Sequence, residues 1–347
     1  MKDDPEKSEA PNPDEGEGKL LIHGVSRREF LLRLGSAGAL IAGSAIAVRA
    51  LWMPNHYLPG FQKEKGLTLP SYKLDEPKTL PTMAIAHGDS HEKTITAAVG
   101  ALGGMERFIR KGDVVVIKPN VAFDRPPALG ATTHPDALRA VARLALAAGA
   151  SKILVADNPI NSPAGCFLKS GLREVADELN LTLLYPEASS FAQIQLEGEI
   201  LKNWAFFHEP FKRATKVIGL APCKDHNLCH ASMSMKNWYG LLGGRRNQFH
   251  QHIHSIISDF PLMMKPTLVI LDGMNVLMKN GPTGGRLSDV KPMGTVVAGT
   301  DMVAIDSYGY TYLLERNLDE LTYIQKAHDR GLGNKNWKEA LYREVQV

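Results

Sequence analysis

Polar side chains able to do chemistry follow the ends of several apolar runs. Lys118-Pro-Asn120 ends the run that starts at Asp113, and His134 stands just before Pro135. A lysine and a histidine beside a helix start suit an anionic ligand, because free N–H groups and the helix dipole add to their positive charge. Thr133 is a candidate cap for the helix that begins near Pro135. The alternative is an ordinary capped helix start with a solvated lysine. Spacing alone leaves both interpretations open.

A denser group follows the apolar run Lys216–Ala221. The next segment reads APCKDHNLCHASMSMKNWYG and contains Lys224, His226, Lys236 and Asn237. Cys and His are ligands for zinc, copper or nickel. A lysine or histidine with a shifted pKa is also a candidate acid or base. The spacing matches no standard metal motif, so a polar loop hydrogen-bonded to the main chain is the alternative.

Two further groups are weaker. In His250-Gln-His252-Ile-His254, a strand would place all three histidines on one face, and a helix would bring His250 and His254 together. A helical pair four residues apart can chelate a metal, but a polar helix face is the favoured interpretation. After Asp272-Gly273 comes a Gly-rich stretch, Asn280–Gly285, that matches no phosphate-binding motif. Asp301 is expected to cap a helix starting at Met302. Asp306 falls inside that helix and needs a partner if it is buried.

These residues are positioned by short apolar strands that alternate with helices. Strands are expected over 113–119, 152–157, 181–185, 216–221, 267–272 and 294–298. Helices are expected over 137–148, 168–179, 247–260, 302–315 and 317–330. The pattern predicts an α/β fold: a mostly parallel sheet with helices on both faces, built from βαβ units. Ligand sites in such sheets form outside the carboxyl ends of the strands. The stretch 187–212, with Trp204, is expected to be an insertion or a domain crossing.

The N-terminal part divides into segments. Residues 1–25 are polar and acidic and are expected to be disordered. Residues 26–50 contain Ser26-Arg27-Arg28-Glu29-Phe30-Leu31 and then the uncharged stretch 34–48, which fits a twin-arginine export signal or an uncleaved membrane anchor. Residues 51–81 are expected to be a linker, and 82–347 the α/β domain. The expected location is periplasmic or extracytoplasmic, and the expected first partner is the twin-arginine export machinery.

The amino-acid composition excludes several classes of protein. The 347 residues are 44% hydrophobic with a net charge of +3, which is globular and too weakly basic to indicate nucleic-acid binding. Three cysteines make no disulfide framework, and the absence of a CxxC pair gives no iron–sulfur motif. Export in the folded state favours a protein with a bound cofactor, so a metal ion or a metal-containing cofactor is expected.

The sequence resembles the family called domain of unknown function 362 over about residues 82–335. The segments that carry the resemblance are VVIKPNVAFDRPP, TTHPDALRAV, KILVADNP, the loop quoted above, TLVILDGMNVLMKNGPTGG and GTDMVAIDSYG. The resemblance places these residues at the family's characteristic positions: Lys118, Asn120, His134, Asp157, Lys224, His226, Lys236, Asn237, Asp272, Asn280 and Asp306. The ferredoxin-like segment of many relatives is missing here. The layout is also similar to the nickel-pincer lactate racemase family.

The functional hypothesis is a single site at the strand ends, where Lys118, His134, Lys224, His226, Lys236 and Asp272 converge. It binds an anionic small molecule or a metal-containing cofactor. His226 and Lys236 are the expected catalytic residues, and the expected ligand-binding residues are Lys118, Asn120, Lys224, Asn237 and Asn280. The expected metal ligands are His134, His226 and Asp272. The alternatives are a non-catalytic cofactor-binding or maturation factor for an exported redox protein, and a nucleotide-binding protein.

Overall fold

The computed structural model describes residues 28, 31–33, 66–75 and 79–347. The expected disordered segment 1–25 and the stretch 34–50 lie outside these residues, and so does most of the arginine motif. In the described part of the chain, every helix is too short or too polar to cross a bilayer. The sheet and its helices belong to the compact unit Glu64–Val347.

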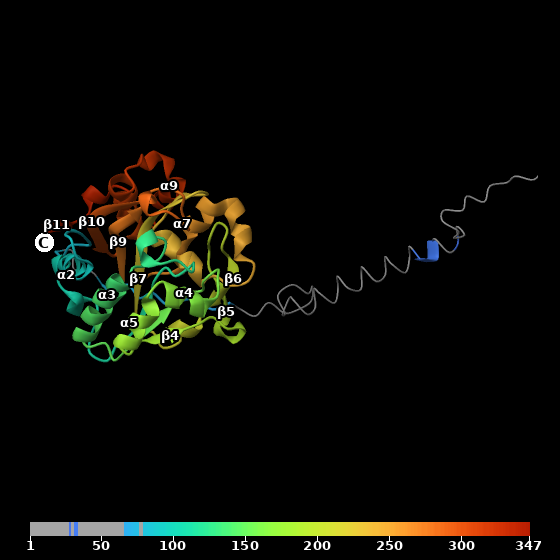
Figure 1. Ribbon diagram of the computed structural model, residues 1–347, viewed down its shortest axis with the longest axis horizontal. Coiled ribbons are helices and arrows are strands. Elements are labelled where there is room, and N and C mark those ends of the chain that lie inside the picture. Colours follow the sequence, from blue (N-terminus) through green and yellow to red (C-terminus); the bar gives the residue numbers. More distant parts are fainter. Residues whose placement is uncertain (1–27, 29–30, 34–65, 76–78) are drawn as a thin grey trace, which may run out of the picture. The chain divides into compact units, whose positions relative to one another are not determined.

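A nine-stranded mixed sheet forms the centre of this unit (Figure 1). The strand order is β11-β1-β10-β9-β7-β2-β3-β4, and β8 pairs with β7 off this path. Strand β10 runs antiparallel to both its neighbours, and β8 antiparallel to β7, while the remaining pairs are parallel. The strands are β1 Met83–His87, β2 Val114–Lys118, β3 Lys152–Ala156, β4 Thr182–Leu184, β7 Lys216–His226, β8 His230–Ser232, β9 Leu268–Leu277, β10 Val290–Gly299 and β11 Tyr342–Gln346. The predicted mostly parallel α/β fold is confirmed.

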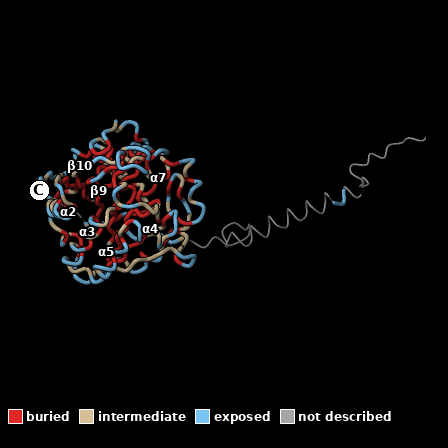
Figure 2. The backbone as a smooth tube through the Cα atoms, in the orientation of Figure 1, coloured by how far each residue is buried: buried red, intermediate tan, exposed pale blue. Residues whose placement is uncertain are grey.

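Helices cover both faces of the sheet. One face packs against α2 (His91–Ala101), α3 (Pro135–Ala147), α4 (Pro163–Lys169) and α5 (Leu172–Glu178). The other packs against α6 (Ser234–Asn237), α7 (Ile253–Met263), α8 (Met302–Tyr308) and α9 (Thr322–Asp329). Figure 2 shows the buried chain concentrated inside and the exposed chain on the outer turns. Because central strands are covered on both sides, they are continuous apolar runs such as Val114–Ile117.

Several elements differ from the sequence prediction. Strand β7 continues past Ala221 to His226, because β8 folds back and pairs with its end. The helix expected over 168–179 is broken in two at Ser170-Gly171, where Gly171 has φ +74°. In the helix expected over 247–260, residues Arg246–His252 are a 3₁₀ segment, so His250 and His254 do not share one α-helical face.

Other differences concern segments without a clear periodic pattern. The stretch around Trp204 is a two-stranded hairpin, β5 (Phe191–Gln195) and β6 (Asn203–Phe207). Part of the expected linker packs on the domain: Leu67 exchanges main-chain hydrogen bonds with the hairpin, and Tyr72 is buried. The strands β1 and β11 and the helix α2 had no predicted counterpart.

The connections define where a ligand site is expected. From β2 the chain moves outward to β3 and then β4, and later returns to place β7 on the opposite side of β2. The carboxyl ends of β2 and β7 therefore lie side by side at a point where the strand order reverses. In open α/β sheets this position forms the ligand crevice. Lys118 is the last residue of β2, and Lys224 lies near the end of β7.

Candidate functional site

Six buried or half-buried polar residues meet at this reversal point, and we call them the lysine cluster: Lys118, Asn120, Asp157, Lys224, Lys236 and Asn237. They come from the ends of β2, β3 and β7 and from α6. The Lys118 Nζ atom lies 2.9 Å from Asp157 Oδ1. It also donates to Asn237 Oδ1 at 2.8 Å and to the Pro119 carbonyl at 2.7 Å.

All the hydrogen-bond donors of the Lys118 ammonium have partners within the protein. Its three hydrogen-bond partners match the three donors of a lysine ammonium. Burial lowers the pKa of Lys118 to about 8, although the adjacent Asp157 carboxylate opposes the shift. The side chain is fully buried, so its charge is balanced inside the protein by Asp157. Lys118 therefore holds β2, β3 and α6 together and has no donor left for a ligand.

Lys224 differs from Lys118 in its hydrogen bonds and in its pKa. Its Nζ donates to Asn120 Oδ1 at 3.0 Å and to the Ala131 carbonyl. Burial, together with the nearby Lys236 and Lys118 charges, lowers the pKa of Lys224 to about 7. A neutral amine has two hydrogens, and these two acceptors take both. The lone pair of the neutral amine then remains available for a proton or an electrophile.

The two asparagines fix the positions of the lysines. Asn237 accepts from Lys118 and from Asn120 Nδ2, the latter at 3.3 Å, and donates to the Lys118 carbonyl at 3.1 Å. Asn120 accepts from Lys224. Its main-chain N–H donates to Thr133 Oγ1 at 2.8 Å, and that hydroxyl donates to the Leu220 carbonyl. The hydroxyl of Thr133 therefore links the strand ends, and the predicted helix cap is wrong: the cap of α3 is His134.

Lys236 lies over an aromatic ring. Its Nζ lies 5.0 Å from the centre of the Tyr239 ring. In the described part of the chain no hydrogen bond or carboxylate pairs with this ammonium. Burial lowers the pKa of Lys236. Nearby, Arg246 donates to the carbonyls of Gly240, Leu242 and Asn158 and likewise has no carboxylate partner there.

His226 lies beside these cations. Burial, followed by the Lys236 and Lys224 charges, lowers the pKa of His226 to about 2, so its ring is neutral. The Nδ1 atom accepts a hydrogen bond from the Leu228 N–H at 3.2 Å. In the neutral ring the proton is therefore on Nε2, which makes His226 a hydrogen-bond donor toward a ligand.

The short helix α6 holds Lys236 and Asn237 in place because Asp306 anchors its start. Asp306 is fully buried and accepts from Ser234 N at 2.8 Å and Met235 N at 3.0 Å, and also from the Ser234 hydroxyl. These bonds supply the partners that a buried Asp306 was predicted to need. As predicted, Asp301 caps α8 by accepting from Val303 N and Ala304 N.

A second group lies where α2 and α3 begin, and we call it the histidine group: His91, His134, Asp136 and Asp272. The rings of His91 and His134 are stacked with centres 4.2 Å apart. His91 Nε2 lies 3.2 Å from Asp272 Oδ2. Burial lowers the pKa of His91, but Asp272 and Asp136 outweigh it and the net shift is upward. Burial and the His91 charge lower the pKa of His134.

The predicted site residues thus fall into separate places. Lys118, Asn120, Lys224, Lys236 and Asn237 are together, and His226 is beside them. His134 and Asp272 are instead in the histidine group, and among the described residues no hydrogen bond or ion pair joins either of them to His226. Asn280 is exposed and donates to Asp289 in a turn. The prediction missed His91 and Arg246.

The fold and these polar groups define an α/β protein with its candidate sites at the carboxyl edge of an open mixed sheet. Residues 115–311, more than half of the chain, match the family described as Domain of unknown function (DUF362). The chain belongs to that family. The resemblance found in the sequence is thereby confirmed for the family.

Known proteins similar to this chain include one curated relative and one solved structure. The thylakoid-associated protein sll1697 of Synechocystis sp. is 28% identical over 248 residues, which cover 67% of this chain and 72% of the relative. The structure of the lactate racemase apoprotein from Thermoanaerobacterium thermosaccharolyticum aligns with a TM-score of 0.32 and 14% identity. That alignment covers 75% of this chain and 58% of the racemase chain, so this chain spans less than two thirds of that structure.

Proposed function

We propose that the lysine cluster binds a small anionic molecule, with a carboxylate or a phosphate as the recognised group. The observation that carries this proposal is the Lys236 ammonium, which has no counter-ion in the described part of the chain. Lys118 is neutralised by Asp157. Lys236 remains as a half-buried amine without a hydrogen-bond partner among the described residues, and Arg246, which donates to main-chain carbonyls, adds positive charge near it. A half-buried charge is costly unless it is paired. A bound anion supplies the missing partner.

The polar groups around this position have complementary roles. Lys236 and Arg246 offer charge, and His226 offers a neutral N–H donor. Lys224 offers an amine that is half-protonated near pH 7. A base with a pKa near the working pH is the kind that proton-transfer catalysis requires. The proposed reaction class is therefore proton transfer to or from a bound organic anion, with Lys224 as the base and Lys236 as the anion contact.

Several residues of the lysine cluster, and His226, have other roles in this proposal than those expected from the sequence. His226 was expected to ligate a metal, but its neighbours Lys236 and Lys224 are cations that repel a metal ion. Lys118 was expected to hold the anion, but its three donors are used within the protein. Asn120 and Asn237 orient lysines rather than the ligand in this proposal.

The test is calorimetric binding of inorganic phosphate and of small mono- and dicarboxylates to the full chain. Lys236→Met is expected to weaken binding at least about tenfold, in line with the worth of a charge-assisted hydrogen bond. Lys338→Met is the matched control, because Lys338 also lies over an aromatic ring, Trp337, at 5.5 Å but is exposed. Equal affinities of the two variants would overturn the proposal.

The non-catalytic alternative uses the same cluster differently. A cofactor-binding or maturation factor would keep its ligand without turning it over. An anion that copurifies with the protein, survives gel filtration and is recovered unchanged would favour this alternative. Loss of that anion in Lys236→Met, but not in Lys338→Met, would still locate it at the lysine cluster.

We also propose that the chain is exported through the twin-arginine route. The support is the motif at 26–31 and the name of the Synechocystis relative, which associates that protein with the thylakoid. Replacing Arg27 and Arg28 by lysine is expected to leave the protein in the cytoplasmic fraction. Unchanged fractionation of that variant would contradict export by this route.

A further inference from the structure

The histidine group has the composition of a metal site, and the lysine cluster does not use it. We propose that His91, His134 and Asp136 bind one divalent transition-metal ion, with Zn²⁺ as the best-matched ion, and that Asp272 orients His91. Two imidazoles and a carboxylate are a common ligand set for zinc. This inference goes beyond the proposed anion site and does not depend on it.

The distances bring the three ligands within reach of one ion. His91, His134 and Asp136 each offer a ligand atom, and these atoms lie within 4.8 Å of one another. His134 Nδ1 lies 3.6 Å from Asp136 Oδ2. Two ligand atoms on a tetrahedral zinc ion with bonds of about 2.1 Å are roughly 3.4 Å apart. This pair therefore needs little movement to share an ion.

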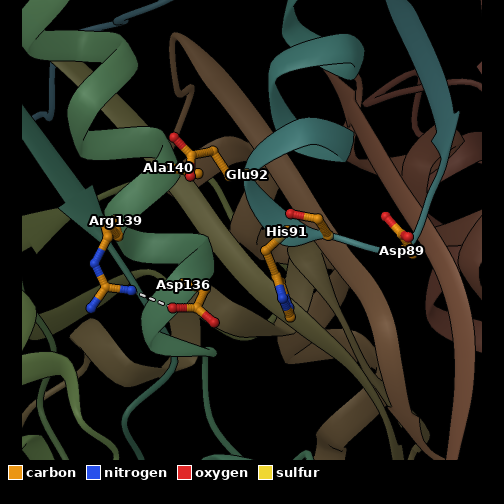
Figure 3. Close-up of a pocket in the computed structure, with 7 residues that line it drawn as sticks. Asp89, His91, Glu92, Asp136, Arg139 and Ala140 are labelled. Atoms are coloured by element: carbon orange, nitrogen blue, oxygen red, sulfur yellow. Dashed lines mark hydrogen bonds and ion pairs between the residues drawn. The ribbon is translucent and has the colours of Figure 1, made fainter. Parts of the chain in front are cut away.

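Hydrogen bonds show which nitrogen of His134 and which oxygen of Asp136 face the proposed ion. His134 Nδ1 accepts from the Asp136 N–H at 3.2 Å, so the proton of the neutral ring is on Nε2, and metal binding at Nδ1 replaces this one capping hydrogen bond. Asp136 gives Oδ1 to Arg139, which leaves Oδ2 toward His134. Figure 3 shows Asp136 held by Arg139 at the start of α3 and His91 at the start of α2, on the two sides of one cavity.

His91 is oriented as a metal ligand often is. Its Nε2 is buried, makes no directed hydrogen bond, and faces Asp272 Oδ2 at 3.2 Å. Asp272 is itself buried and accepts from the Met274 N–H. A carboxylate behind one ring nitrogen fixes the ring and raises the basicity of the other nitrogen, which then binds the metal. Asp272 is thus a positioning residue for His91.

Charge and space also favour a cation. The adjacent cavity of about 340 Å³ is lined by Asp89 and Glu92 as well as Asp136, with Arg139 as the cation among its lining residues. Asp136 and Asp272 supply negative charge toward a divalent ion, and Arg139 offsets part of it. Three protein ligands leave the fourth position of a tetrahedral ion open, and the cavity gives water or a small ligand access to it.

The test uses the full chain without a polyhistidine tag, treated with a chelator and then titrated with Zn²⁺ alone and with Co²⁺ alone. About one ion per chain is expected, with the visible absorption of tetrahedral cobalt. Asp136→Asn and His134→Ala are expected to remove high-affinity binding. Asp272→Asn is expected to weaken it about 10- to 100-fold, the usual effect of losing a carboxylate behind a ligand.

The controls separate a lost ligand from a lost fold. His87→Ala removes a histidine that is bonded to Thr295 and Glu344 at the same sheet edge, and it is expected to bind metal as the wild type does. Asp136 is more than half exposed, so Asp136→Asn is expected to keep the fold. Substoichiometric binding by the wild type, or equal affinity in Asp136→Asn and His87→Ala, would overturn the metal site. Either result leaves the test of anion binding at Lys236 unaffected.

Discussion

Gly240 lies against the carboxylate of Asp157 so closely that a Cβ atom there would come 2.2 Å from Asp157 Oδ1 and 2.9 Å from Lys118 Nζ. The turn after α6 therefore closes directly over the buried Lys118–Asp157 ion pair. A side chain at this position and the ion pair cannot occupy the same space. The ion pair between Lys118 and Asp157 therefore requires a residue without a side chain at position 240.

The first prediction is that Gly240→Ala breaks this pair and strongly destabilises the protein. Disrupting a buried ion pair costs about 3–5 kcal/mol. Gly100→Ala is the matched control, because Gly100 lies in α2 and nothing beyond its own helix comes within 4 Å of the place a methyl group would take. Alanine there stabilises a helix by about 0.5–1 kcal/mol. Urea unfolding measures both. Similar midpoints for the two variants would contradict the role of Gly240.

The second prediction concerns the pH dependence contributed by Lys224. Its pKa is about 7 in the folded protein and about 10.4 when exposed. Between these values the unfolded chain binds more protons, so this lysine makes stability rise with pH, with a slope of up to about 1.4 kcal/mol per pH unit. Below pH 7 the folded protein bears the full free-energy cost of burying the charged Lys224 amine. Above about pH 10.5 this cost has disappeared, because the lysine is neutral in both states.

Unfolding of the wild type and of Lys224→Met at several values between pH 7 and 10 measures this contribution. The slope of stability against pH is expected to be smaller in the variant by up to about 1.4 kcal/mol per pH unit, which corresponds to one proton. Lys338→Met is expected to keep the wild-type slope, since Lys338 is exposed. Parallel curves for wild type and Lys224→Met would show that Lys224 keeps an ordinary pKa.

The sequence predicted the lysine cluster better than the histidine group, and the reason is local. Lys118 and Lys224 follow apolar runs whose strand character is visible in the sequence, and parallel strand ends meet at one edge. His91 begins a helix after β1, and its partner Asp272 ends a distant apolar run. Their contact depends on β10 inserting between β1 and β9, and no local pattern specifies that strand order.

The length of strand β7 could not be predicted from local sequence either. Its last residues were expected to be a loop because they are polar, yet the return strand β8 pairs with them and extends the sheet to His226. Strand pairing here overrides local propensity. The single site expected at the strand ends is consequently two groups, because β7 and β2 hold one and the starts of α2 and α3 hold the other.

The third prediction concerns Asp306, which links stability to the position of Lys236. Burial raises the pKa of Asp306 to about 7, although hydrogen bonds from Ser234 and Met235 oppose the shift. Between about pH 4 and 7 the folded protein therefore binds more protons than the unfolded chain, and stability falls as pH rises. In Asp306→Asn this decline is expected to be absent, because an amide does not titrate.

The same carboxylate anchors the start of α6, so its removal should also affect ligand binding. Asp306→Ala leaves the Ser234 and Met235 N–H groups unpaired, which costs roughly 1–3 kcal/mol for each buried donor. Anion affinity is expected to fall with it, because α6 carries Lys236. Ser307→Ala is the control: Ser307 is equally buried in α8, but its hydroxyl bonds only back to the Val303 carbonyl. Calorimetry at pH 6, with both variants verified as folded, measures the effect. An Asp306→Ala protein that binds phosphate as tightly as Ser307→Ala would show that α6 holds Lys236 without this anchor.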